Sequence, residues 1–175
     1  MLRQWIEEDL PIFAALNSDP EIMKYFPALL SREESDAMAT KCKSLIEERG
    51  WGVWAVELKS SNEFIGFVGL HTPKPNIPFS PCVEIAWRLH KKFWGNGYAT
   101  EAAQQALSHA FNSLNLKEVV SFTTISNLRS RAVMERLGLT NTYRNFEHPD
   151  VPKGHPLSEH VLYKITKSEW QEKNK

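Results

Sequence analysis

Two closely spaced glycines mark the part of the chain best suited to binding an anion. Gly95 and Gly97 stand between an apolar, β-type run that ends at Leu89 and a helix-type run that begins at Ala99. Glycine lets the backbone turn tightly, and the free N–H groups and dipole at a helix start attract phosphate. The loop is not a P-loop, because no Gly-Lys-Ser/Thr follows, and it lacks the third glycine of a dinucleotide fingerprint, because Thr100 stands there. The spacing favours a phosphate or pyrophosphate site, and a simple chain turn is the other interpretation.

A carboxylate within an apolar run is the second feature that could do chemistry. Glu84 lies in the run from Val83 to Leu89, which has the composition of a buried strand. An ionised carboxylate there costs free energy unless it is paired or faces a wet cleft. We therefore predict that Glu84 is a general base, acting directly or through water, or that it forms a structural ion pair with Arg88 or Arg131.

The composition excludes several classes of function. Lys and Arg number 21, and so do Asp and Glu, so the chain lacks the basic surplus that nucleic-acid binding requires. No segment approaches the ~18 consecutive apolar residues that span a bilayer. The first ten residues carry no apolar stretch of a secretory signal, and Cys and His are not spaced as zinc ligands. We expect a cytoplasmic protein without a metal, whose partner is small or peptide-like and is neither nucleic acid nor membrane.

The first half of the chain predicts two helices and a hairpin that precede these features. A short strand over residues 2–5 leads into a helix over residues 7–17. Ser31 and Glu34 form a capping box, after which apolar residues recur at helical spacing until Gly50: Met38, Cys42, Leu45 and Ile46. Residues 52–58 and 64–70 are β-branched and aromatic runs on either side of a polar turn, which is typical of an antiparallel hairpin.

The second half alternates strands and helices. A loop over residues 71–81 contains four prolines and cannot pair as a central strand. The pattern then predicts six further elements: a strand over 83–89, an amphipathic helix over 99–116, a strand over 118–124, a helix over 127–137 closed by Gly138, and two strands over 140–146 and 160–165. We therefore expect an α+β fold in a single domain over residues 1–175.

Five short motifs in a fixed order extend over most of the chain. They are DPEIMKYF at residues 19–26, VEIAWRL at 83–89, WGNGYATEA at 94–102, NLRS at 127–130 and ERLGL at 135–139. With them the sequence resembles the GNAT acetyltransferase superfamily, and within it the branch of the RimJ/RimL-type ribosomal-protein N-terminal acetyltransferases. The resemblance implies a GNAT fold, with a mixed, mostly antiparallel, V-shaped sheet flanked by helices. It also implies acetyl-CoA in the splay between the strands at 83–89 and 118–124.

The same resemblance implies how acetyl-CoA is held. Backbone groups around Trp87 and Leu89 would hold the pantetheine arm, and Asn127 would lie near the thiol end. The pyrophosphate would be wrapped by Trp94, Gly95, Asn96, Gly97, Tyr98, Ala99 and Thr100. The Gln or Arg that usually opens the loop motif is replaced here by Lys92 or Trp94, so we expect main-chain donors to carry most of the binding.

Acetyl transfer to an amine needs a neutral nucleophile, a polarised thioester carbonyl and a proton for the leaving thiolate. The resemblance implies direct attack in a ternary complex, with a main-chain N–H near Leu89 polarising the carbonyl. The Tyr that many GNAT enzymes use as general acid would fall at Met134, which has no proton to give. Ser130 is the best remaining hydroxyl, and a helix-capping or surface role is its alternative.

The acceptor side is the least determined part of the sequence. Residues 146–160 look like a subfamily loop over the acceptor, in which His148 and His155 either line the substrate and assist the base or are ordinary loop residues. Tyr25 and Phe26 would form the opposite wall, or else pack in the core. Because no acidic cluster is evident to bind a polycation, a protein N-terminal α-amine is preferred as the acceptor over a small amine such as a polyamine or an antibiotic.

The predicted function is therefore that of an acetyl-CoA-dependent N-acetyltransferase acting on a primary amine. A non-catalytic acyl-CoA-binding sensor is the alternative from another class, because the usual Tyr is missing. The sequence does not determine the oligomeric state, and a homodimer is compatible with it.

Overall fold

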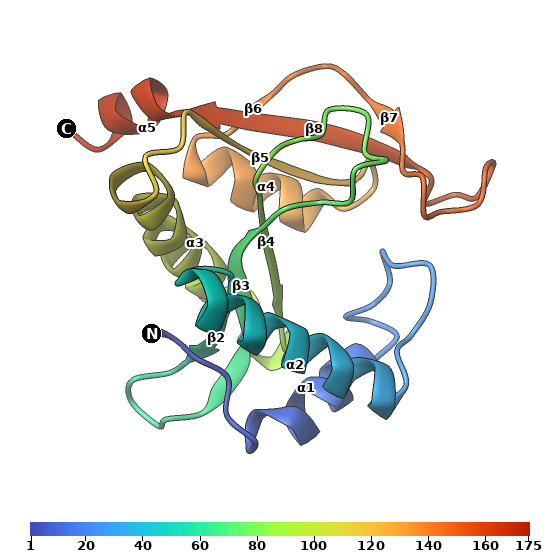
Figure 1. Cartoon of the computed structure of the whole chain (residues 1–175). Coiled ribbons are helices and arrows are strands. Elements are labelled where there is room, and N and C mark those ends of the chain that lie inside the picture. The colour runs from blue at the N-terminus through green and yellow to red at the C-terminus, as the bar shows by residue number, and fades with distance from the viewer.

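One eight-stranded sheet organises the chain, and the computed structural model describes every residue from Met1 to Lys175 (Figure 1). The spatial order is β1-β2-β3-β4-β5-β8-β6, and β7 also pairs with β8. All neighbours are antiparallel except β4 and β5. The strands are β1 Leu2–Arg3, β2 Val53–Glu57, β3 Phe64–His71, β4 Glu84–Leu89, β5 Glu118–Thr124, β6 Thr140–Asn141, β7 Phe146–Glu147 and β8 Glu159–Thr166.

The sheet splays between its two central strands. β4 and β5 pair at a single register, Glu84 with Val120, where the Val120 N–H donates to the Val83 carbonyl at 3.0 Å. The Ser121 hydroxyl adds a bond to the Ile85 carbonyl at 2.9 Å. Beyond this point the strands separate, which confirms the predicted V-shaped sheet of the GNAT fold.

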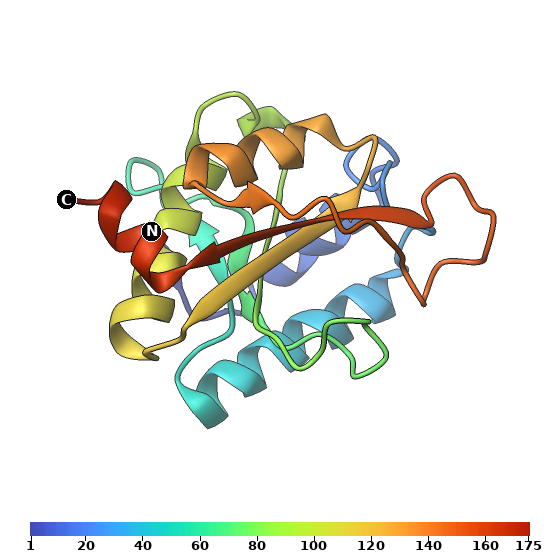
Figure 2. The ribbon, with the colours of Figure 1, turned by 90° about the horizontal axis from the view of Figure 1, so that it is seen from above.

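Helices cover both faces of the sheet. α1 (Asp9–Asn17) and α2 (Arg32–Arg49) pack on one face, and α3 (Tyr98–Ser108) and α4 (Leu128–Leu137) on the other. Figure 2 shows α2 and α4 on opposite sides of β5 and β8. The smaller apolar cluster, under α1 and α2, includes Phe13 and Phe67. The larger one, under α3 and α4, includes Ile85 and Leu89, so Glu84 and Arg88, which alternate with them along β4, face α1 and α2.

The capped helices form where the sequence predicts them. Glu34 N–H donates to the Ser31 hydroxyl, and Ser31 N–H donates to the Glu34 carboxylate, so the capping box of α2 is complete. Gly50 ends α2 at φ +78°, and Gly138 ends α4 at φ +93°. None of the helices has the length and apolar character that crossing a membrane requires.

The predicted strand over residues 140–146 is wrong, because a turn interrupts it. Asn141 Oδ1 accepts the Tyr143 N–H at 2.8 Å, and Tyr143 takes a positive φ of +57°. Asn side chains stabilise such turns by bonding the backbone two residues on. β6 and β7, at the two ends of the segment, pair with β8, and between them Thr142 adds one N–H bond to the Leu162 carbonyl at 2.9 Å.

Two helical features also differ from the prediction. The helix expected over residues 99–116 is α-helical only to Ser108 and continues as a π-helical turn over His109–Ser113. A C-terminal helix, α5 (Lys167–Lys173), was not predicted. Its sequence signal was present, because Thr166 and Glu169 form a second capping box.

Candidate active site

Glu84 and His71 form the polar pair at the point where the sheet opens. β3 and β4 are antiparallel, and their register places His71 opposite Glu84. His71 Nε2 lies 2.8 Å from Glu84 Oε2, and the Glu84 side chain is only 8% exposed. An ion-pair partner was predicted for Glu84, but the predicted partners are wrong. Arg88 bonds to Asn17, and Arg131 bonds to Tyr163 and to the Ile125 carbonyl.

The environment of His71 favours its charged form. Burial lowers the pKa of His71, but the charge and the hydrogen bond of Glu84 outweigh this effect, so the pKa lies above its ordinary value. An imidazolium at this position satisfies the buried carboxylate, which explains why Glu84 can occupy an apolar strand. Sequence reasoning missed His71, because it assigned this residue to the proline-rich loop, whereas His71 is the last residue of β3.

An aromatic cluster borders this pair on the side of β8. Phe79, from the proline-rich loop, packs edge to face against Phe122 of β5 and Phe146 of β7, at centroid distances of 5.7 and 5.0 Å. The rings of His148 and His160 lie 4.9 Å apart in the same cluster. Burial lowers the pKa of both imidazoles, and the negative charge of Glu84 acts on His148 in the opposite direction.

The structure separates the two loop histidines that the sequence singled out. His148 lies in the aromatic cluster and in the field of Glu84. His155 lies in the connection between β7 and β8, where its Nδ1 accepts the Leu157 N–H at 3.1 Å. A further contact, between Lys74 and Asp150 at 2.7 Å, ties this connection to the proline-rich loop.

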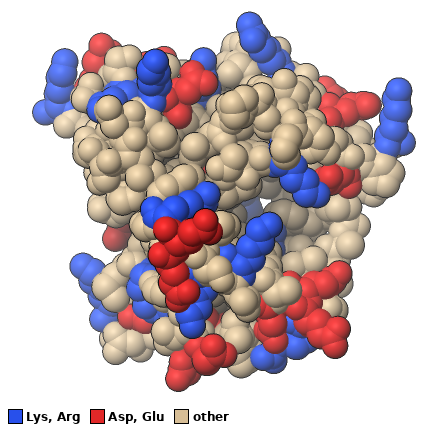
Figure 3. All heavy atoms as spheres, in the orientation of Figure 1, with Lys and Arg blue, Asp and Glu red and all other residues tan.

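The residues expected to form the opposite wall of the acceptor site lie in the connection between α1 and α2. Tyr25 is half-buried and Phe26 is 40% exposed, so neither ring is part of the core. The Phe26 ring covers the guanidinium of Arg88, whose Cζ is 4.1 Å from the ring centroid. Burial lowers the pKa of Arg88 to about 10, so the group stays protonated at neutral pH. Figure 3 shows the molecule hollowed near its middle, with acidic and basic side chains interspersed over this face.

Backbone groups line the splay on the β4 side. N–H and C=O groups alternate in direction along a strand. The carbonyls of Val83 and Ile85 point to β5, and the His90 N–H points to β3. The backbone groups of Trp87 and Leu89 therefore face the splay, where β5 has moved away. The Leu89 carbonyl accepts the Trp94 indole N–H at 2.8 Å, which leaves the Leu89 N–H directed at the opening.

The glycine loop ends in an open helix N-terminus. Gly95 and Gly97 have φ of +80° and +81°, and a Cβ added at either would meet open space. Gly97 is the N-cap of α3 and has no side chain to satisfy the first N–H groups. Asn96 closes the loop by donating to the carbonyls of Phe93 and Trp94. The residues at the helix start, Tyr98, Ala99 and Thr100, present the free backbone donors that an anion requires.

The two polar residues at the start of α4 have different roles. Asn127 is the N-cap: its Oδ1 accepts the Ser130 N–H at 3.3 Å, and its Nδ2 donates to the Thr123 hydroxyl at 2.9 Å. Both polar groups of Asn127 are thus used within the fold. The Ser130 side chain is half-buried one turn further on. Met134, at the place of the usual Tyr, is 1% exposed and belongs to the core.

One basic residue beside the glycine loop was not singled out from the sequence. Arg129 stacks its guanidinium on Trp94, with Cζ at 4.4 Å from the ring centroid. The lysines before the loop are engaged elsewhere, Lys91 with Asp19 and Glu21, and Lys92 with Glu63.

Free main-chain donors, flexible glycines and one nearby Arg fit the pyrophosphate of a CoA thioester, and the open edge of β4 fits an amide-rich pantetheine arm.

Comparisons with known proteins agree with this geometry. The family model described as Acetyltransferase (GNAT) domain matches residues 1–140. An FsC-acetyl coenzyme A-N(2)-transacetylase of Aspergillus fumigatus is 34% identical over 164 residues, which cover 89% of this chain and 68% of the relative.

Two solved structures show the same fold at low sequence identity. A spermidine N-acetyltransferase from Vibrio cholerae, in complex with CoA and spermine, superposes with a TM-score of 0.76 at 20% identity, over 98% of this chain and 97% of that one. A ribosomal-protein-S5-alanine acetyltransferase from Vibrio fischeri superposes with a TM-score of 0.75 at 16% identity, over 97% and 93%. These two enzymes are named for different acceptors, so the shared fold does not select between a polyamine and a protein N-terminus.

Proposed function

The chain belongs to the GNAT acetyltransferase family and is an acetyl-CoA-dependent N-acetyltransferase, and from this premise we propose that it acetylates a primary amine by direct attack, with Glu84 as the base. The observation that carries this proposal is the buried Glu84–His71 pair at the point where β4 leaves β5. A carboxylate held at the closed end of the splay is next to the place where the thioester and the amine must meet.

Glu84 takes the proton that the amine must lose. At neutral pH an alkyl amine is largely an ammonium ion, and only the neutral form has the lone pair that attacks the carbonyl carbon. Glu84 accepts this proton directly or through a water molecule. His71 donates a hydrogen bond to the Glu84 carboxylate and holds it in place for this transfer.

Backbone and hydroxyl groups complete the reaction. On the open edge of β4 near Leu89, the Trp87 N–H also faces the splay and is the closer to Glu84, and it donates to the thioester oxygen as negative charge develops on it. The new C–N bond forms as the C–S bond breaks, and the nitrogen loses its second proton. Ser130 or water gives a proton to the leaving thiolate and is reprotonated from the nitrogen, so the proton lost by the amine ends on the thiol of CoA. In the same proposal, Trp94 to Thr100 hold the pyrophosphate, and Asn127 acts through the position of Ser130 as its N-cap.

We propose that the acceptor is a peptide α-amine. We also propose that the chain belongs to the RimJ/RimL branch of the family. Support for the branch comes from the five sequence motifs and their order. The histidines beside Glu84 have lowered pKa values because of burial, so they are neutral at pH 7 and do not repel an ammonium group. Tyr25, Phe26 and His148 would line the amine, and His155 would lie further out.

A screen of acceptors tests the function. Acetyl-CoA is incubated with short peptides that have a free N-terminus, with polyamines and with aminoglycosides, and free CoA thiol is measured. We expect thiol release with peptides and none when their N-terminus is already acetylated. Release with polyamines alone would overturn the peptide assignment, and no release with any amine would leave the acyl-CoA sensor as the better account.

Replacing the base tests the mechanism. Glu84→Gln keeps the shape of the side chain, so we expect unchanged CoA affinity and a kcat lower by ~100-fold or more, the size expected for losing a general base. The loss should shrink as pH rises, because more of the acceptor is already neutral. Glu118→Gln, at an exposed carboxylate on the neighbouring strand, is the control and should keep full activity. Near-normal turnover of folded Glu84→Gln at neutral pH would show that Glu84 is structural.

A further inference from the structure

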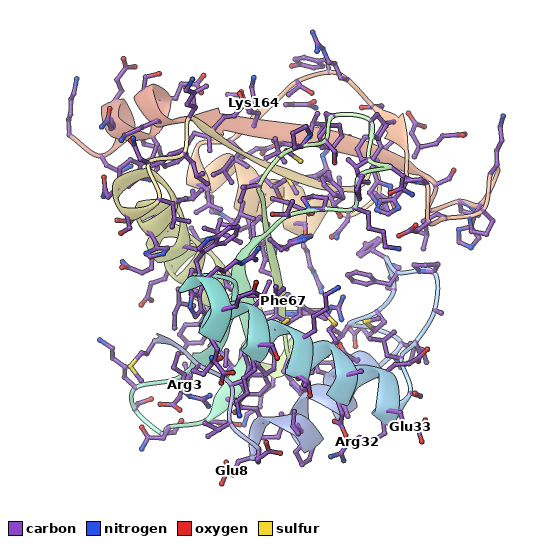
Figure 4. The ribbon with its side chains drawn as sticks, viewed as in Figure 1. Arg3, Glu8, Arg32, Glu33, Phe67 and Lys164 are labelled. Carbon is purple, nitrogen blue, oxygen red and sulfur yellow. The ribbon has the colours of Figure 1, made fainter.

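Arg88 is a partly buried cation to which the proposed mechanism gives no role. It lies on β4 directly opposite Phe67, and Figure 4 shows Phe67 beside α2. Its guanidinium is held between the rings of Phe26 and Phe67, at 4.1 and 5.3 Å. Nη1 donates to Asn17 Oδ1 at 2.5 Å, while the buried Nε has no hydrogen-bond partner.

The charge of Arg88 is not neutralised within the protein. Asp19 and Glu21, the acidic residues of the nearby α1–α2 connection, both bind Lys91, at 2.9 and 3.3 Å. Glu84, on the same face of β4, binds His71. A guanidinium removed from water without a carboxylate is costly, and aromatic faces with one amide oxygen compensate only part of that cost.

The position of Arg88 relates it to the acceptor. Glu84 and Arg88 lie on the same face of one strand, four residues apart, which corresponds to roughly 13 Å between their Cα atoms. The ring that covers Arg88 belongs to Phe26, which the proposed function places in the acceptor wall. The planar donors of Arg match a carboxylate in a two-point contact.

We propose that Arg88 binds a carboxylate of the acceptor, so that the substrate is an amine that carries an acid group about one short peptide away from the reacting nitrogen. The inference rests on the proposed function, because it takes the amine to be at Glu84. It also argues against polyamines, since a second ammonium group of the acceptor would be repelled at Arg88.

Matched acid and amide acceptors test this. The tripeptide Ala-Ala-Ala extends over roughly 10 Å from its amine to its carboxylate, and its C-terminal amide differs only in charge. For the wild type we expect kcat/KM to be at least 10-fold higher for the acid. In Arg88→Met, kcat/KM for the acid should fall to the value for the amide, while kcat/KM for the amide changes less than 2-fold. Arg88→Lys should keep part of the preference, because it keeps the charge without the planar fork.

Arg32→Met is the control, since Arg32 is exposed at the start of α2, pairs with Asp36 and is labelled in Figure 4 at that end of the helix. It removes the same charge and should leave the acid preference unchanged. The comparison of acid and amide tripeptides on the wild type requires no variant, so it tests the inference even if Arg88→Met folds poorly. Equal kcat/KM for acid and amide in the wild type, or an acid preference that survives in folded Arg88→Met, would overturn the inference.

Binding measurements separate this inference from the proposed function. Calorimetry with the CoA complex compares the same acid and amide peptides without requiring turnover. If the acid binds at least 10-fold more tightly and Arg88→Met abolishes the difference, Arg88 is an acceptor site even where no peptide is acetylated and the proposed function fails. If neither binding nor turnover distinguishes acid from amide, Arg88 is a structural cation.

Discussion

The residues around Glu84 illustrate how a buried charge is kept in an apolar strand. Glu84 is compensated by one imidazole from the neighbouring strand, at 2.8 Å. Removing one partner of such a buried pair leaves the other uncompensated and is costly. The pair therefore links the stability of the fold to the protonation of His71.

The link predicts a dependence of stability on pH. The pKa of His71 is raised in the folded chain, so the folded state binds more protons than the unfolded state between the ordinary His pKa of about 6.5 and the raised value. The stabilisation by His71 should be complete below about pH 6.5 and lost as pH rises through the raised pKa. Urea unfolding of wild type and His71→Gln over this range should show a difference in free energy that falls with rising pH.

A control separates this effect from the loss of any histidine. His155→Gln removes an imidazole that bonds only to the local backbone, and its difference from the wild type should not follow the same curve. A stability difference between wild type and His71→Gln that is constant, or that grows with pH, would contradict the assignment of the pair.

Ser130 is the second residue whose role can be measured. If its hydroxyl protonates the thiolate, Ser130→Ala should lower kcat by roughly 10- to 100-fold and change the KM for acetyl-CoA little. Steady-state kinetics over a range of acetyl-CoA concentrations gives both values. Ser44→Ala, whose hydroxyl bonds to the backbone on α2, is the control. An equal loss of kcat in both variants, or no loss in Ser130→Ala, would show that Ser130 does not protonate the thiolate.

At the scale of elements, the start of α3 has its N–H groups free because its N-cap is a glycine. Most helix starts are capped by a side chain, as Ser31 caps α2. An uncapped start next to two glycines with positive φ leaves both space and donors for an anion. The start of α3 therefore lacks the stabilisation that a side-chain cap provides, and the phosphates of a bound CoA would accept hydrogen bonds from its free N–H groups.

This difference predicts opposite outcomes for two equivalent substitutions. Gly97 and Gly50 have nearly the same φ, +81° and +78°, and a Cβ at either meets open space. Val at each position should strain the backbone by a similar amount, of order 1–2 kcal/mol. We expect Gly97→Val to raise the Kd for CoA at least 10-fold in calorimetry, and Gly50→Val to leave it unchanged. Unchanged affinity in folded Gly97→Val would remove the pyrophosphate assignment.

At the scale of the whole molecule, the sheet is two parts joined weakly at β4 and β5. A single register pair and the Ser121 bond connect them, and the helices behind supply the remaining contact. A ligand in the splay would bridge both parts, and any ligand that binds only the folded state raises its stability.

Thermal unfolding measures this bridging. CoA at about 100 times its Kd should stabilise the fold by about 2.7 kcal/mol, which for a chain of this size raises Tm by roughly 5–10 °C. The increase should be smaller in Gly97→Val at the same CoA concentration and intact in Gly50→Val. A wild-type Tm that saturating CoA does not change would mean that CoA does not bind the folded chain.

Local signals in the sequence were enough to predict most of the elements and the glycine turn before α3. Capping residues, proline and glycine positions and hydrophobic periodicity act within a few residues, so they can be interpreted without the fold. They predicted α2, the β2–β3 hairpin, β5 and the α4 cap, and a T-x-x-E pattern at Thr166 would have added α5. The strand over 140–146 failed because one Asn side chain competes with the sheet for the backbone.

Partners distant in sequence were decided by the tertiary structure alone. Glu84 was identified as an anomalous charge, but its partner His71 is set by the β3–β4 register, which depends on the whole hairpin. Arg88 was taken as a partner for Glu84, although both lie on one strand and Arg88 instead reaches Asn17 and Phe26 from the α1 region. Charge and residue type are local properties, whereas pairing, burial and the direction of a side chain follow from how strands and helices pack, and these decide which charges are left for a substrate.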